Sequence, residues 1–527
     1  MRGEPATFNR YVDNAFPTDL IALLTTGRLV RINRVTDTPE PWLAAAWTVS
    51  PDTRSITLDL RPGVVWSDGT PFTADDVTFS FAAASDTHFA NVMTDVVRVG
   101  DAPIAVRAES PLRVVLTFDK PYAPGVRLLD AIPIYPKHAL GAALAAGTFG
   151  SAWGPQTPSE QMPVLGPFLV QSYTPAERVV LTRNPHYWRK DAGGHALPYL
   201  DTLTLEIAPD QNTELLRLAG GQVDLTQTQL RPDDYREMKA AADAGKVRLV
   251  DAGPGFDRYL LWFNLAAAPG GARGFLLDDR FRQAVALAVS RQGFVDSVYL
   301  GAAEPSPFAV PPANHDWLPA GLTPPPFDPK QASALLEAMG LRDRDNDGVR
   351  EDAAGHAARF TILVQAGVTA GEKGAQFIRD QLAPVGVAVD VVAMDLGAVI
   401  KRWKQGDYDA VYHHVTPSDT DPATNMDWWL SSGGMHMWHP GQKTPATPWE
   451  KQIDTLMAAQ VASGSPVQRA ALFTDVQKLF LAHNPALYFA TPRVFVATGR
   501  HVGGASPVPT TPPVLWAADE LYVTPAP

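Results

Sequence analysis

The densest group of side chains able to contact a solute lies between residues 408 and 442. A site for a sugar or a peptide needs flat apolar faces for stacking and a few fixed polar groups for orientation. This segment supplies both kinds, and its candidate contact residues are Tyr412, His414, Asp419, Asp421, Asn425, Trp428 and Trp438. It therefore predicts a binding site. The simpler alternative is that Trp428 and Trp429 belong to a core and that the aspartates cap a helix.

An acidic turn supplies the first half of a calcium loop. Asp343, Asp345 and Asp347 alternate along it, and Gly348 follows. Oxygen ligands at the first, third and fifth positions with glycine at the sixth fit calcium, but the twelfth position, which needs a glutamate, holds Ala354. We favour a surface turn without metal and keep calcium as the alternative.

The histidines of the same segment, His413, His414, His436 and His439, raise direct capture of nickel or another metal as a further possibility. His436 and His439 stand three residues apart, and imidazole binds nickel and similar ions. Gly433, Gly434 and Pro440 favour a loop over the helix that would make the two rings converge. We therefore expect no bound metal.

Enzyme motifs are missing from the sequence. It contains no G-x-S-x-G, H-E-x-x-H, dinucleotide or phosphate-loop motif, and it has no cysteine that could act as a nucleophile. A cofactor is therefore not expected. A hydrolase is the alternative from another class, because catalytic pairs form in space rather than in sequence.

Length and charge narrow the class of protein. A chain of 527 residues is too long for one core and predicts about three packed units. A net charge of −12 argues against a nucleic-acid partner, which calls for a basic face. The sequence contains no run of 18 apolar residues, so no membrane span is predicted.

The elements that must position the candidate site follow an α/β order. Strands are predicted over 360–365, 388–394 and 408–415, with helices over 372–382 and 396–405 between them. A strand is predicted over 259–264, followed by one long helix over 279–299, and two amphipathic helices over 449–461 and 466–481. The candidate segment therefore begins in a buried strand and continues into a loop.

Residues 42–81 form a pattern of two short strands, a turn and a capped helix. Ile56, Leu58 and Leu60 alternate with polar residues, which predicts a strand with one buried face. Thr73 can cap a helix that carries Asp75 and Asp76 in its first turn. This part of the chain predicts a scaffold rather than a reactive site.

The same stretch resembles the signature of the family 5 extracellular solute-binding proteins, the peptide- and nickel-type receptors that feed ABC importers. The residues that carry the resemblance are Trp47, Ser50, Asp52, 60–64 (LRPGV) and 66–77 (WSDGTPFTADDV). Further segments resemble later parts of the family pattern, namely 132–138, 165–168, 183–188, 215–225 and 279–301. The resemblance covers nearly the whole chain.

The resemblance implies an α/β, two-lobed periplasmic-binding-protein-like fold of the large three-subdomain type (class II). It implies a hinge and a ligand cleft between the lobes. Residues 1–258 would begin lobe one, with 37–160 as an additional subdomain. Residues 259–484 would form lobe two, and 485–527 would return to lobe one.

The resemblance also implies a function and several site residues. The protein would be a monomeric receptor that captures an oligopeptide and delivers it to an ABC transporter permease, with an oligosaccharide or a nickel complex as alternatives. Family peptide binders place a carboxylate ahead of a proline to hold the peptide ammonium, and Asp419 and Asp421 stand ahead of Pro422. Asn264 and Arg31 match further positions of the family's ligand cleft. The alternatives are that Asn264 caps a turn and, favoured for Arg31, that it is a surface arginine.

The resemblance finally implies export. The protein would work in the periplasm or on the outer face of the cytoplasmic membrane, as a lipoprotein. The opening residues Met1–Pro5 do not form a signal peptide. We therefore expect the sequence to be a mature or truncated form that lacks its signal and anchor.

Overall fold

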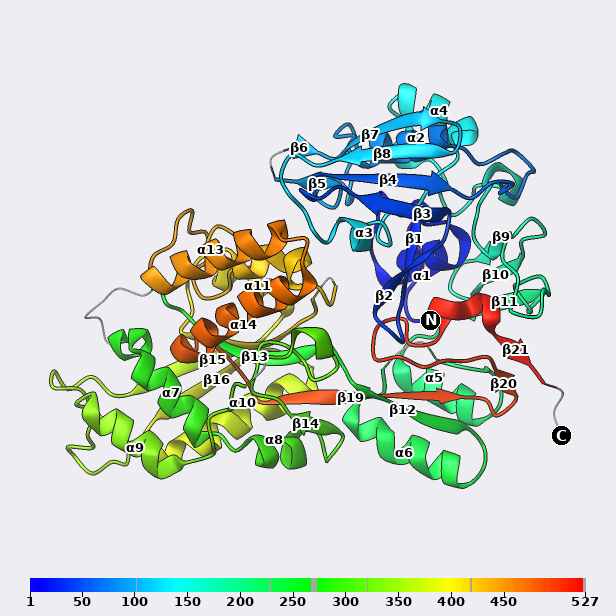
Figure 1. Cartoon of the computed structure of the whole chain (residues 1–527). Coiled ribbons are helices and arrows are strands. Elements are labelled where there is room, and N and C mark those ends of the chain that lie inside the picture. Colours follow the sequence, from blue (N-terminus) through cyan, green and yellow to red (C-terminus); the bar gives the residue numbers. More distant parts are fainter. Residues whose placement is uncertain (101, 227–228, 267–272, 320, 418, 525–527) are drawn as a thin grey trace. The chain divides into compact units, whose positions relative to one another are not determined.

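The computed structural model describes residues 1–100, 102–226, 229–266, 273–319, 321–417 and 419–524. The chain divides into two compact units (Figure 1). Unit 1 comprises Met1–Ala252, Ala462–Gly464 and Phe495–Pro527, and unit 2 comprises Gly253–Val461 and Ser465–Val494. Both units mix helices and sheets, so the predicted two-lobed α/β class is confirmed. Residues 37–160, which the resemblance makes an additional subdomain of lobe one, lie within unit 1.

Unit 1 is built around several small antiparallel sheets. Its helices are α1 (Phe16–Thr25), α2 (Ala74–Ala84), α3 (Gly125–Leu128), α4 (Lys137–Ala145), α5 (Gln211–Ala219) and α6 (Pro232–Asp243). Its strands are β1 (Val30–Asn33), β2 (Thr38–Pro41), β3 (Ala44–Val49), β4 (Ser55–Leu60), β5 (Arg98–Val99), β6 (Ala102–Pro103), β7 (Ala105–Ser110), β8 (Arg113–Thr117), β9 (Phe168–Thr174), β10 (Arg178–Arg183), β11 (Thr202–Glu206), β20 (Val502–Gly503) and β21 (Tyr522–Val523). β12 (Arg248–Pro254) leads the chain out of this unit.

The scaffold predicted over residues 42–81 is confirmed. β3 and β4 pair antiparallel, and Ile56, Leu58 and Leu60 of β4 are buried as their alternation predicted. Thr73 caps α2 in a reciprocal capping box, in which Asp76 accepts a hydrogen bond from the Thr73 backbone N–H. The sequence signature is therefore a structural element of unit 1.

Unit 2 contains a five-stranded sheet in the order β16-β15-β17-β13-β18. The strands of unit 2 are β13 (Arg258–Phe263), β14 (Ala303–Pro305), β15 (Arg359–Gln365), β16 (Ala388–Met394), β17 (Ala410–Val415), β18 (Ala486–Tyr488) and the first part of β19 (Ala490–Thr498). Its helices are α7 (Asp279–Ala288), α8 (Arg291–Val298), α9 (Pro329–Ala338), α10 (Thr369–Leu382), α11 (Leu396–Lys404), α12 (Met426–Trp429), α13 (Pro448–Ala462) and α14 (Pro466–His483). β15 pairs parallel with β16 and β17, as strands joined by the crossover helices α10 and α11 must.

Helices cover both faces of this sheet. Alternate residues of β13 point to opposite faces, so Leu261 and Phe263 pack with α7, α8, α9 and α10, whereas Leu260 and Trp262 pack with α11, α13 and α14 (Figure 1). A strand buried on both faces reads as a continuous apolar run, as the YLLWF sequence of residues 259–263 does. The core that contains Leu260 and Trp262 borders the candidate site.

The single helix predicted over residues 279–299 is wrong, because the structure has two. α7 ends at Ala288, and α8 begins at Arg291. Ser290 has extended backbone dihedrals, and its hydroxyl accepts a hydrogen bond from the Gly293 N–H at 3.0 Å, so it caps α8. A serine inside a helical pattern competes with the helix by forming such a cap.

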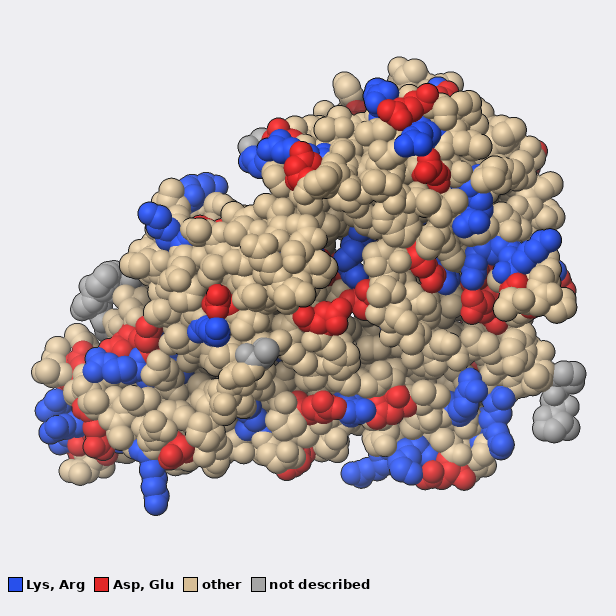
Figure 2. Space-filling view, in the orientation of Figure 1, with Lys and Arg blue, Asp and Glu red and all other residues tan. Residues whose placement is uncertain are grey.

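Within the described residues, no helix combines the length and apolar character that a membrane span requires. On the face shown in Figure 2, basic and acidic side chains are interspersed among broad uncharged areas.

Candidate functional site

Unit 2 holds a cavity of about 300 Å³ beside the ends of β13 and β17. This size lies at the lower end of the range of about 300–1,000 Å³ that is typical of ligand sites. Its lining comes from the start of β13, from residues 309–314, 415–417 and 419–435, from α14 and from β18: Phe256, Arg258, Ala309, Val310, Pro311, Asn314, Val415, Thr416, Pro417, Asp419, Thr420, Pro422, Thr424, Asn425, Asp427, Trp428, Trp429, Met435, Phe473 and Tyr488. Of the candidates named from the sequence, Asp419, Asn425 and Trp428 line this cavity.

A buried ion pair anchors the loop that forms one wall of the cavity. Both carboxylate oxygens of Asp421 accept hydrogen bonds from Arg469 of α14, at 2.6 and 2.8 Å. Asp421 is 2% exposed and Arg469 is 8% exposed. The Asp421 Oδ1 also accepts the Ala423 N–H at 2.9 Å, which begins a 3₁₀ turn. Asp421 therefore holds the loop in place, and its carboxylate is already paired.

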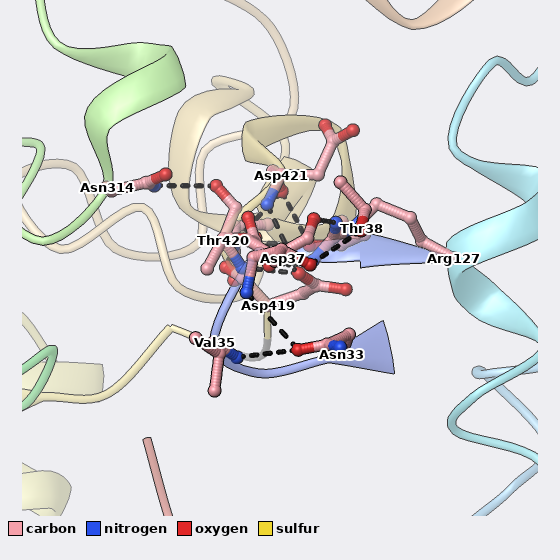
Figure 3. A network of polar contacts seen from close by, with 12 residues as sticks. Asn33, Val35, Asp37, Thr38, Arg127, Asn314, Asp419, Thr420 and Asp421 are labelled. Atoms are coloured by element: carbon pink, nitrogen blue, oxygen red, sulfur yellow. Dashed lines mark hydrogen bonds and ion pairs between the residues drawn. The ribbon is translucent and has the colours of Figure 1, made fainter. Parts of the chain in front are cut away.

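Amide side chains fix the same loop from two directions. Asn314 donates to the Thr420 carbonyl at 2.7 Å (Figure 3). Asn425 donates to the Asp419 carbonyl at 3.1 Å. The Oδ1 of Asp419 accepts from the hydroxyl of Thr420 at 2.9 Å and from the N–H of Asp421 at 3.3 Å. These hydrogen bonds hold residues 419–421 at the cavity wall.

Aromatic rings form the apolar side of the cavity. Trp428 is half-buried and packs edge-on against Trp438, with ring centroids 5.4 Å apart. Trp429 is buried and packs edge-on against Phe473 at 5.1 Å. Both tryptophans therefore belong partly to the core, as the simpler interpretation held, and both also line the cavity. Trp428 leaves the larger ring surface open to a ligand.

Arg258 is a lining residue that the sequence analysis missed. It is 4% exposed, and it donates to the Ser306 hydroxyl at 3.2 Å, to the Phe308 carbonyl at 2.9 Å and to the Ala309 carbonyl. Its guanidinium lies 4.2 Å from the centroid of the Tyr488 ring. Burial lowers the pKa of Arg258 to about 10, so it stays charged at neutral pH. An arginine at the start of an apolar strand was the sequence signal that could have identified it.

Three other candidates lie in structural positions rather than in the cavity wall. Tyr412 is 1% exposed and Trp438 is 0% exposed, and both pack in the cores on the two faces of the sheet. Asn264 donates to the carbonyls of Gly406 and Tyr408, at 2.9 and 2.8 Å, and accepts from the Ala266 N–H. It therefore closes a turn after β13, the alternative to ligand contact for an asparagine at a strand end.

The histidines of β17 have opposite electrostatic surroundings. His414 Nδ1 lies 2.8 Å from the carboxylate of Asp257, and this hydrogen bond raises the pKa of His414. Burial, together with the neighbouring His414, lowers the pKa of His413 from 6.5 to about 4. Neither residue lines the cavity, so the candidate His414 is engaged by Asp257 instead.

We expect acid to destabilise unit 2 through His413. The unfolded chain takes up a proton near pH 6.5, whereas folded His413 resists protonation until about pH 4. Stability from this residue is therefore present above pH 6.5 and is lost as the pH falls toward 4. His414 has a raised pKa, so its contribution to stability has the opposite pH dependence: it is present at low pH and is lost as the pH rises.

The measurement is the melting temperature of wild type and His413→Asn between pH 7 and pH 4. The variant is expected to lose less stability than wild type across this window. His315→Asn is the control, because His315 is exposed, and its curve is expected to follow that of wild type. Parallel curves for His413→Asn and wild type would contradict the assignment.

Cavities in unit 1 contain charged groups of their own. Arg31 lines one of about 40 Å³, pairs with Glu40, and lies 4.0 Å from the Trp42 ring centroid. A larger cavity of about 360 Å³ lies beside β11, where Glu206 and Arg217 form an ion pair at 3.2 Å. The charged groups named in both cavities thus have partners already.

The acidic turn closes on itself in unit 2. Carboxylate oxygens of Asp343, Asp345 and Asp347 lie within 4.8 Å of one another and of an oxygen of Glu351. Gly348, with a φ of 90°, donates its N–H to Asp343 at 3.1 Å, and Arg344 donates its N–H to Glu351 at 2.9 Å. The structure adds Glu351 to the three aspartates that the sequence identified.

We expect this turn to act as a surface turn. Its carboxylates accept hydrogen bonds from the turn's own backbone, so millimolar calcium should leave the melting temperature nearly unchanged. A ligand at a hundred times its dissociation constant would add about 2.7 kcal/mol to the stability. A rise of several degrees in calcium, absent in magnesium, would identify the turn as a calcium site.

Comparison with known proteins identifies relatives over most of the chain. The chain is 27% identical over 519 residues to a probable ABC transporter-binding protein of Deinococcus radiodurans, covering 94% of this chain and 87% of that protein. It is 26% identical over 485 residues to the periplasmic alpha-galactoside-binding protein of Rhizobium meliloti, covering 84% and 67% of the two proteins. The resemblance to transporter-associated receptors is confirmed.

Solved structures share the fold. The substrate-binding protein CtaP of Listeria monocytogenes matches with a TM-score of 0.81 at 20% identity, covering 100% of this chain and 98% of that one. The oligopeptide-binding protein AppA of Bacillus subtilis, in complex with a nonapeptide, matches with a TM-score of 0.73 at 20% identity and the same coverage. Residues 38–437 match the family described as bacterial extracellular solute-binding proteins, family 5 Middle. The chain therefore belongs to the family 5 bacterial extracellular solute-binding proteins.

Proposed function

We propose that this protein is a receptor that captures a short peptide outside the cytoplasm and delivers it to the permease of an ABC importer. It performs no chemistry on the peptide and acts as a monomer. It is exported to the periplasm or to the outer face of the cytoplasmic membrane, where a lipid anchor holds it. Ligand contacts come from the unit 2 cavity through Asp419, Asn425 and Trp428.

The observation that carries the proposal is the composition of the cavity wall. A half-buried ring, Trp428, stands beside a loop whose backbone is fixed by Asn314 and Asn425. Asp419 and Asp427 add negative charge to the same wall. A peptide offers what such a wall recognises, since it has apolar side chains for the ring and an ammonium for a carboxylate. The relatedness to AppA, which was solved with a nonapeptide, supports this ligand class.

An oligosaccharide is the second candidate ligand. Sugars stack on aromatic rings and bond to amide and carboxylate groups, and Trp428, Asn425 and Asp427 supply these. The relative from Rhizobium meliloti is an alpha-galactoside-binding protein. A nickel complex held by histidine is less favoured, because no histidine is among the described residues that line the cavity.

Native mass spectrometry of protein purified gently from a peptide-rich culture tests the proposal. We expect a population heavier than the free chain, and release of an intact peptide on denaturation. The released peptide, added back, should bind saturably and remain uncleaved on prolonged incubation. Release of an oligosaccharide would move the second candidate to first place. Steady conversion of a bound peptide to fragments would refute the receptor assignment in favour of a hydrolase.

Asp419→Asn is expected to weaken binding of a free-amine peptide at least about tenfold, because a charge-assisted bond to the ammonium is lost. Asparagine keeps an oxygen for the hydrogen bonds from Thr420 and Asp421, so the loop should hold. Calorimetric titration with a peptide and its N-acetylated form measures the effect. The N-acetylated form should lose little affinity. Equal, small changes with both peptides would show that Asp419 is only a structural cap.

A further inference from the structure

Arg258 has no anionic partner among the described residues. Within the part of the chain that the structure describes, no carboxylate lies within ion-pair distance of its guanidinium, and its partners are one hydroxyl and two carbonyls. The adjacent carboxylate, Asp257, is engaged by His414 at 2.8 Å and Thr416 at 3.0 Å. Buried charges are ordinarily paired, because an unpaired one costs several kcal/mol of desolvation.

The hydrogen bonds of Arg258 leave part of its donor set unused. A guanidinium has five N–H donors. The Nη1 atom donates to Ser306 and Phe308, and Nη2 donates to Ala309. The Nε–H is buried and has no partner in the structure. An arginine with unused Nε–H and Nη–H groups offers the fork that binds both oxygens of a carboxylate.

Arg258 lies at the wall of the candidate cavity. Arg258 lines the same cavity as Asp419 and Trp428. The Tyr488 ring lies against its guanidinium, and the loop over residues 306–309 holds it by three hydrogen bonds, so the cation is preorganised. A fixed, dehydrated cation gains more from an anion than a mobile surface arginine does.

We propose that Arg258 binds a carboxylate of the ligand, so that the cavity selects peptides with a free C-terminus. The inference rests on the proposed function, because it assigns one end of the peptide that the receptor would capture. With Asp419 near the ammonium, the two charges would make the cavity specific for short zwitterionic peptides rather than for neutral sugars. Arg258 acts as a specificity-determining residue by direct contact.

The test compares a short peptide with its C-terminal amide, by calorimetric titration, in three proteins. Wild type is expected to bind the free acid at least about tenfold more tightly than the amide, because only the acid makes the charge-assisted fork. Arg258→Met is expected to bring the ratio of the two affinities close to one. Arg291→Met is the matched control. Arg291 is another arginine whose pKa burial lowers to about 10, it donates to the Pro325 carbonyl, and it does not line the cavity.

The ratio of the affinities for the free acid and the amide distinguishes a loss of carboxylate recognition from damage to the folded protein. Loss of the 306–309 loop would weaken acid and amide alike and leave their ratio at the wild-type value, whereas loss of carboxylate recognition changes the ratio. An acid-to-amide ratio near one in wild type, or a wild-type ratio in Arg258→Met, would overturn the inference and leave the peptide receptor standing. Failure of every peptide to bind wild type would overturn the proposed function together with the inference.

Discussion

Replacing Glu450 by glutamine is expected to lower the free energy of unfolding by about 3–5 kcal/mol, the cost of breaking a buried charged network. Glu450 is 1% exposed and accepts hydrogen bonds from a ring of donors at the start of α13. One oxygen accepts from His436 at 3.1 Å, His439 at 2.6 Å, Trp438 at 3.3 Å and Gln442 at 3.3 Å. The other accepts from the Ala446 N–H and from the N–H and hydroxyl of Thr447.

Glutamine cannot replace this acceptor. Its amide NH₂ must stand in place of one of the two oxygens, where it meets donors whichever way the side chain turns. Urea denaturation measures the loss. Glu337→Gln is the control, because Glu337 is exposed on α9 and its ion pair with Arg350 is long, at 3.4 Å. The control should change stability by less than about 0.5 kcal/mol. Similar small losses in both variants would show that the network is not stabilising.

The same network predicts acid sensitivity. Burial alone would raise the pKa of Glu450, but the hydrogen bonds from His436 and His439 hold that pKa well below its ordinary value of 4.5. Its contribution is therefore present above pH 4.5 and is lost as the pH falls below that value. The Glu450 carboxylate and the rings of His436 and His439 place one ligand atom each within 4.8 Å of one another, and the two rings lie 3.1 and 2.6 Å from the same carboxylate oxygen.

Asp421→Asn is expected to cause a second large loss of stability. It leaves Arg469 buried beside a neutral partner, and breaking a buried pair in this way costs about 3–5 kcal/mol. Because Asp421 also anchors the loop that carries Asp419, peptide affinity should fall with stability. Urea denaturation and calorimetric titration measure the two losses on the same preparations.

An exposed pair on the same helix is the control for this variant. Lys478 and Asp475 of α14 lie 2.7 Å apart, and both side chains are about half exposed. Exposed pairs contribute about 0–1 kcal/mol, so Asp475→Asn should change neither stability nor affinity appreciably. In the double variant Asp421→Asn, Arg469→Met, part of the lost stability should return, because the unpaired charge is gone. An additive loss in the double variant would contradict the coupling.

The sequence predicted the sheet of unit 2 well because its signals are local. Apolar runs with α/β order marked β13, β15, β16 and β17, and the capping residues marked α2 and its hairpin. The break between α7 and α8 was missed because Ser290 fits a helical pattern as a neutral residue, and only the structure shows that its hydroxyl accepts the Gly293 N–H.

The segment predicted to contact a solute supplies part of a cavity wall, but only some of its candidate residues line that cavity. Residues 408–442 do supply the cavity wall, yet Tyr412 and Trp438 are core residues, and Asp421 pairs with Arg469, which lies 48 positions away. Pairings over such distances in sequence leave no local pattern. Arg258 stands at the start of an apolar strand, which is a local signal, but its burial against the backbone carbonyls of residues 308 and 309 left no further mark in the sequence.

Hydrogen–deuterium exchange with and without a saturating bound peptide tests the central claim, that the solute contacts the unit 2 cavity. We predict slower exchange in residues 306–314 and 419–429 when peptide is bound, because both segments line the cavity or hold its wall. Protection confined to residues 200–206 and 515–523, beside the larger cavity of unit 1, would contradict the claim and place the ligand there.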